Sequence, residues 1–117
     1  MSNFISLDQA VVMTSRYRKE MNEILAHSFQ GQNILAICET FEKEDILKVL
    51  NKPECEKLRV YYGMDGNKKV HAIIVAVNTN NEDILPKIEA EETIEEDILD
   101  NAFRCPIYCP PSSPLNS

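Results

Sequence analysis

Tryptophan is absent from the 117 residues, glycine occurs only three times, and aromatic side chains make up 7% of the chain. A hydrophobic core must therefore be built mainly from aliphatic side chains. With glycine limited to Gly31, Gly63 and Gly66, the glycine-rich loops that bind nucleotide phosphates are excluded. The longest uninterrupted apolar run covers residues 72–77, which is far below the roughly 20 residues that span a bilayer.

Basic residues are also scarce, because 12 Lys and Arg stand against 19 Asp and Glu, for a net charge of -7. This is the wrong sign for a protein that binds nucleic acid or anionic membranes, so neither is expected as a partner. The first eight residues contain no basic residue and no export signal, so we expect a cytoplasmic protein. In that compartment cysteines are normally kept reduced.

The overall composition is typical of a globular protein, with 44% hydrophobic and 26% charged residues. The length is near the most common domain size, so residues 1–117 are expected to form a single domain. Ser6 and Gln9 fit a capping box that opens an amphipathic helix over residues 6–27. The apolar series of this helix is Leu7, Ala10, Val11, Thr14, Tyr17, Met21, Ile24 and Leu25.

Two shorter elements follow the first helix. Residues 34–41 are compatible with a strand or with the start of another helix, and we favour the strand. Residues 42–51 are predicted as a short helix, because acids cluster at its start and apolar residues follow. Pro53 then ends that helix.

The alternation of residue types predicts a β-hairpin over residues 58–78. Its turn, Asp65-Gly66-Asn67-Lys68, consists of residues that tolerate a positive φ. A loop of two or four residues would place His71 on the same face as Leu58, Val60 and Tyr62, among apolar neighbours. The second strand is apolar on both faces, which predicts a central, covered position in the sheet.

Charge is distributed unevenly along the chain. Residues 80–101 hold nine acids and one base, so this segment carries -8 and the remainder +1. We expect it to form an exposed, partly helical acidic patch. The final residues, 104–117, contain four of the six prolines and are predicted to be an extended tail. Together these elements predict an α+β fold: a small antiparallel sheet centred on the hairpin, with the N-terminal helix packed on it.

The cysteine-containing tail carries the most specific chemical pattern, Cys105-Pro-Ile-Tyr-Cys109-Pro. A close pair of cysteines commonly supplies half of a zinc site, which Cys55, His71 or Cys38 would complete. The alternatives are a redox-active disulfide between Cys105 and Cys109, or thiols packed as small hydrophobic groups. Nucleophilic catalysis requires a cysteine or serine beside His27 or His71, which makes a thiol-dependent enzyme the third choice.

Four segments carry a resemblance to known proteins. They are Pro53-Glu-Cys, Leu58-Arg-Val-Tyr-Tyr-Gly-Met-Asp, Val70-His-Ala-Ile-Ile-Val-Ala-Val, and Arg104-Cys-Pro with Cys109-Pro. These segments resemble a group of small uncharacterised proteins from Bacteroidota, and the similarity extends from about Thr40 to Leu115. The resemblance implies a bacterial source and a shared fold, without a reaction. It also places Cys55, Cys105 and Cys109 in one pattern, which implies a joint role for the three thiols.

The function predicted from these observations is that of a cytoplasmic protein-interaction module. The first helix has a heptad-like apolar stripe that suits self-association, and the acidic patch suits a basic partner protein. No catalytic set is apparent, and no catalytic or cofactor-binding residue is predicted. The alternative is a zinc-binding protein that uses Cys55, Cys105, Cys109 and His71 as ligands.

Overall fold

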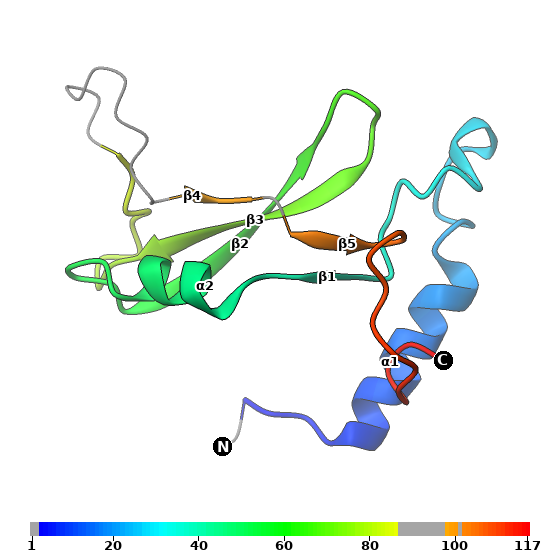
Figure 1. The fold of residues 1–117 in the computed structure, drawn as a ribbon, viewed down its shortest axis with the longest axis horizontal. Helices are drawn as coiled ribbons and strands as arrows, with labels where there is room; N and C mark the ends of the chain where they lie inside the picture. Colours follow the sequence, from blue (N-terminus) through cyan, green and yellow to red (C-terminus); the bar gives the residue numbers. More distant parts are fainter. Residues whose placement is uncertain (1–2, 87–97, 101) are drawn as a thin grey trace. The chain divides into compact units, whose positions relative to one another are not determined.

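The predicted hairpin forms the centre of the sheet in this computed structural model, whose described residues are 3–86, 98–100 and 102–117 (Figure 1). The chain divides into two compact units. We call Met1–Cys38 with Arg104–Ser117 the terminal unit, and Glu39–Phe103 the central unit. The fold is α+β, as predicted. The expectation that residues 1–117 form a single domain stays a prediction, because the structure divides into these two units.

In the terminal unit, helix α1 spans Leu7–Glu20 and begins with the predicted capping box between Ser6 and Gln9. The helix ends earlier than the predicted residue 27. Hydrogen-bonded turns follow the end of the helix. In one of them the N–H of Leu25 donates to the carbonyl of Asn22, three residues earlier, at 3.2 Å. No residue of α1 is buried, so tertiary packing does not extend the helix. A short 3-10 helix, η1, follows at His27–Phe29.

The C-terminal residues lie against α1 within the terminal unit. The Arg18 guanidinium donates to the carbonyls of Leu115 and Ser117, the latter at 2.8 Å. The tail is not extended throughout, because the N–H groups of Asn116 and Ser117 both donate to the carbonyl of Ser113 at 3.1 Å. The prediction of an extended tail was therefore wrong at residues 106–107 and 114–116, which form turns. Proline restricted φ as expected, but local hydrogen bonds closed the chain into turns.

The predicted strand over residues 34–41 is much shorter in the structure. Strand β1 covers Cys38–Thr40 and pairs with β5, Phe103–Cys105, in a two-stranded sheet where the chain passes between the units. The preceding residues do not extend this strand. The carbonyls of Asn33 and Ile34 instead accept hydrogen bonds from the buried Arg104 side chain, both at 2.7 Å.

In the central unit, β2 (Lys57–Met64), β3 (Val70–Val77) and β4 (Ile98–Leu99) form an antiparallel sheet in the order β2-β3-β4 (Figure 1). The central position predicted for the second hairpin strand is confirmed, because β3 pairs on both sides. Its last four residues are buried. The apolar character of both its faces therefore has a direct structural cause.

The register of the hairpin differs from the one that a two- or four-residue loop would produce. Met64 pairs with Val70, so the loop holds five residues, 65–69. The Asp65 carboxylate stabilises this loop by accepting from the N–H groups of Asn67 at 2.8 Å and Lys69 at 3.1 Å. His71 consequently lies opposite Gly63, and the prediction that it shares a face with Val60 and Tyr62 was wrong.

Helix α2, Lys43–Leu50, confirms the short helix predicted over residues 42–51. It contributes Val49 to a core that includes Ile74 and Ala76 of β3. Partly buried side chains complete this core: Phe41, Ile46, Cys55, Ile84 and Leu99. Because α1 belongs to the other unit, the predicted packing of the N-terminal helix on the sheet stays a prediction.

Most of the predicted acidic patch, 80–101, lies outside the described residues, since 87–97 and 101 are not described. Its described acids are Glu82, Asp83 and Asp100. In the described part of the chain, no helix is long and apolar enough to cross a membrane.

Candidate functional site

One face of β2 exposes a continuous row of large apolar side chains. Because side chains alternate along a strand, Leu58, Val60, Tyr62 and Met64 point to the same side. Their exposed fractions are 43%, 41%, 81% and 65% in that order. Neighbouring β3 residues on this face, such as Ile74, are covered as part of the core. The row, which we call the β2 row, is therefore an apolar surface that the described residues leave partly exposed.

The β2 row coincides with an open backbone edge. Among the described residues, β2 pairs with β3 alone. The N–H of Asp65 donates to the carbonyl of Lys69 at 3.0 Å, and in an antiparallel ladder such bonded positions alternate along the strand. The backbone groups of Leu58, Val60 and Tyr62 therefore face away from β3. Within the described part of the chain, the same residues present unpaired backbone groups and apolar side chains.

The opposite face of β2 is held by a polar network. Arg59 donates to the Asp83 carboxylate at 2.6 Å, and the Tyr61 hydroxyl donates to its other oxygen at 2.5 Å. The hydrogen bond from Tyr61, followed by the contact with Arg59, lowers the pKa of Asp83. Hydrogen bonding to Asp83 raises the pKa of Arg59. This network ties β2 to the chain after β3 and fixes the strand that carries the β2 row.

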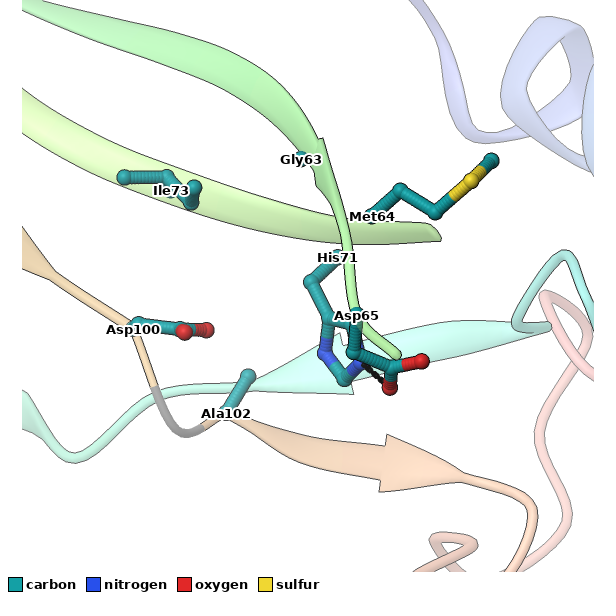
Figure 2. Close-up of a pocket in the computed structure, with 7 residues that line it drawn as sticks. All are labelled: Gly63, Met64, Asp65, His71, Ile73, Asp100 and Ala102. Atoms are coloured by element: carbon teal, nitrogen blue, oxygen red, sulfur yellow. Dashed lines mark hydrogen bonds and ion pairs between the residues drawn. The ribbon is translucent and has the colours of Figure 1, made fainter. Parts of the chain in front are cut away.

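A pocket of about 350 Å³ lies at the turn end of the hairpin, on the face that carries His71. Figure 2 shows the His71 ring and the Asp65 carboxylate side by side within it. The lining residues are Gly63, Met64, Asp65, His71, Ile73, Asp100 and Ala102.

The His71 imidazole is flanked by two carboxylates. Its Nε2 lies 2.6 Å from an oxygen of Asp65, and its Nδ1 lies 3.7 Å from Oε1 of Glu39. The other oxygen of Glu39 accepts from the N–H of Ala72 at 2.9 Å. Nε2 therefore faces the Asp65 carboxylate at hydrogen-bond distance, whereas the 3.7 Å from Nδ1 to Glu39 is longer than a hydrogen bond. The cluster orients the hairpin loop.

The carboxylate of Asp65 gives this cluster a pH dependence. Its pKa is lowered from the ordinary value of 3.8, first by the hydrogen bond with His71 and then by the N–H of Lys69. A lowered pKa stabilises the fold above the ordinary value, and this contribution is lost as the pH falls through the folded-state pKa.

Asp65→Asn is therefore expected to lower the free energy of unfolding at pH 7 and to have a smaller effect near pH 3, below the ordinary pKa of 3.8. Urea unfolding at the two pH values measures the difference. Asp100→Asn is the matched control, since Asp100 lines the same pocket and makes no hydrogen bond or ion pair with described residues. An equal effect of Asp65→Asn at both pH values would contradict the role of its charge.

The structure places the predicted zinc ligands in both units. Cys55 and His71 belong to the central unit, where the Cys55 thiol packs against the core and donates to the carbonyl of Lys57 at 3.5 Å. Cys105 and Cys109 belong to the terminal unit and form a disulfide, so they are not thiolate ligands in this state. In the described ranges, no group of three or more His, Cys, Asp and Glu side chains could hold a metal ion.

The disulfide corresponds to the second alternative that the sequence left open for these cysteines. Cys38 and Cys55 are free thiols. Zinc binding by Cys55, Cys105, Cys109 and His71 stays a prediction for the reduced protein.

Sequence reasoning missed Glu39 and Asp65 as partners of His71. Asp65 was identified only as a turn residue, and the loop length that places it beside His71 is not encoded in the alternation pattern. Glu39 reaches His71 from a different strand, β1, with no local signal.

Comparison of the chain with protein-family models, curated proteins and solved structures finds no match. The resemblance to Bacteroidota proteins therefore stays a prediction, and the assignment of a function rests on the residues themselves.

Proposed function

We propose that this protein is a self-associating interaction module whose partner is a second copy of the same chain. The β2 row on an open strand edge is the observation that carries this proposal. Exposed edges are usually protected by charged residues or proline, because they pair readily with other strands. The β2 row consists of Leu58, Val60, Tyr62 and Met64. The charged residues of the strand, Lys57 and Arg59, lie on its other face, where Arg59 is paired with Asp83.

The self-complementarity of β2 is the reason for proposing a second copy of the chain as the partner. In an antiparallel pair centred on Tyr61, Val60 lies opposite Tyr62 of the second copy, and Leu58 lies opposite Met64. These four positions have their backbone groups at the open edge, so the pairing adds hydrogen bonds along the whole row. Two copies would form one continuous six-stranded antiparallel sheet.

Charge favours the same register. At each end of the pairing, Lys57 of one copy lies opposite Asp65 of the other, and no like charges face each other in between. A two-fold axis repeats this favourable pair, as is usual in homodimers. In this proposal the association takes place in the cytoplasm.

A cysteine at the symmetry axis tests the register. In the proposed pairing, Tyr61 faces itself at a non-hydrogen-bonded position, where Cα atoms lie about 4.5 Å apart. This separation suits a disulfide. Tyr61→Cys is therefore expected to form a covalent dimer under mild oxidation, with the linked peptide identified by mass spectrometry.

Lys57→Cys is the matched control, because Lys57 is exposed on the same face of β2 but lies far from its own copy in this register. The Lys57→Cys variant contains the same native cysteines as the Tyr61→Cys variant, so cross-linking through native thiols is equal in the two. Equal cross-linking of the two variants, or cross-links only through native cysteines, would contradict the pairing centred on Tyr61.

A further inference from the structure

The disulfide of the terminal unit joins two cysteines of very different accessibility. Cys105 lies at the end of β5 and is only 2% exposed, whereas Cys109 is exposed. The residues between them include Ile107 and Tyr108, which are 82% and 60% exposed. An exposed cysteine, its buried disulfide partner and two exposed apolar side chains are thus gathered in one short loop.

We propose that Cys105 and Cys109 form a thiol–disulfide exchange site that oxidises dithiols of polypeptide substrates. Which sulfur is attacked is governed by access, so the incoming thiolate attacks Cys109. Ile107 and Tyr108 contact apolar residues beside the substrate cysteine. This inference is independent of the pairing through β2.

The exchange balances in two steps. A substrate thiolate attacks Sγ of Cys109, the bond to Cys105 breaks, and the Cys105 sulfur leaves and takes up a proton. The second substrate thiolate then attacks the substrate sulfur of this mixed disulfide and releases Cys109. The substrate loses two electrons and two protons as its own disulfide forms, and the protein gains them as two thiols.

Backbone hydrogen bonds also hold the loop that contains the two cysteines. The N–H of Tyr108 donates to the carbonyl of Arg104 at 2.9 Å, and the N–H of Cys109 donates to the carbonyl of Ile107 at 3.0 Å. The carbonyl of Cys105 accepts from the N–H of Ile37 at 2.9 Å. The loop is therefore held by hydrogen bonds that do not involve sulfur, which suits a bond that opens and closes.

A purely structural role explains the bond poorly. The two cysteines are separated by only four positions, and the stabilisation by a disulfide is smallest for short loops. Disulfides in the cytoplasm, where we place this protein, are usually catalytic or redox-sensing. Both considerations favour exchange over a permanent cross-link.

The first test compares single variants of the full chain with 5,5′-dithiobis(2-nitrobenzoic acid) as the probe. Cys105→Ser leaves the exposed Cys109 thiol, which is expected to react at least about tenfold faster than the Cys105 thiol left by Cys109→Ser. The double variant corrects for Cys38 and Cys55. Equal rates in the two single variants would overturn the assignment of Cys109 as the attacked sulfur.

The second test uses the unmodified chain, so it does not depend on the folding of a variant. A synthetic peptide with two cysteines and neighbouring leucines is mixed with the oxidised protein. One peptide disulfide is expected to form for each protein disulfide lost, and glutathione disulfide is expected to restore the protein bond. A disulfide that persists in excess peptide dithiol and excess reduced glutathione would overturn the proposal, whatever the state of self-association.

Discussion

Replacing Val60 and Tyr62 by lysine is expected to raise the dimer dissociation constant by about 100-fold or more. In the proposed register, Val60 lies opposite Tyr62 of the second copy, so the double variant places lysines opposite each other at two symmetric positions. Like charges directly opposite in a sheet are destabilising, and lysine on an edge strand opposes pairing. The apolar contact is lost at the same time.

Sedimentation equilibrium of the double variant and the unmodified chain measures this change. Thr79→Lys with Asn80→Lys is the control, because it adds the same charge at exposed positions after β3. That control should leave the dissociation constant within a factor of about two. If the control weakens association as much as Val60→Lys with Tyr62→Lys, net charge rather than the β2 row is responsible.

Ile74→Ala is expected to lower the free energy of unfolding by about 2–4 kcal/mol. Ile74 is 4% exposed and packs in the core with Val49 and Ala76, so its truncation leaves a cavity under α2. A loss of this size is a large part of the stability of a small domain. Urea unfolding measures it.

Ile98→Ala is the matched control for Ile74→Ala. It makes the same substitution in the neighbouring strand β4, at a side chain that is 50% exposed. We expect Ile98→Ala to lower the free energy of unfolding by less than half as much as Ile74→Ala, because the Ile98 side chain buries less apolar surface on folding. Equal losses from the two variants would place the core of the central unit elsewhere.

The sequence predicted the elements whose signals are local. The alternation at Leu58, Val60 and Tyr62 and the β-branched run of 70–77 specify the hairpin, since both reflect strand geometry. Acids at the start of 43–50 and Pro53 after it specify α2 in the same way. The capping box at Ser6 located the beginning of α1, whereas its end depended on packing that a sequence pattern does not contain.

The candidate site was less predictable, because it depends on loop length and on contacts distant in sequence. A single additional loop residue, making the loop 65–69, moved His71 to the other face and beside Asp65. Glu39 joined this cluster from β1. The exposure of the β2 row followed from strand order, since an alternating pattern does not tell which strand lies at an edge.

Sedimentation equilibrium of the unmodified chain, from micromolar concentrations to about 1 mM, tests the central claim most directly. Self-association through β2 predicts that the apparent mass rises with concentration from 13.4 kDa and levels off at twice that value. An apparent mass of 13.4 kDa at every concentration would contradict the account.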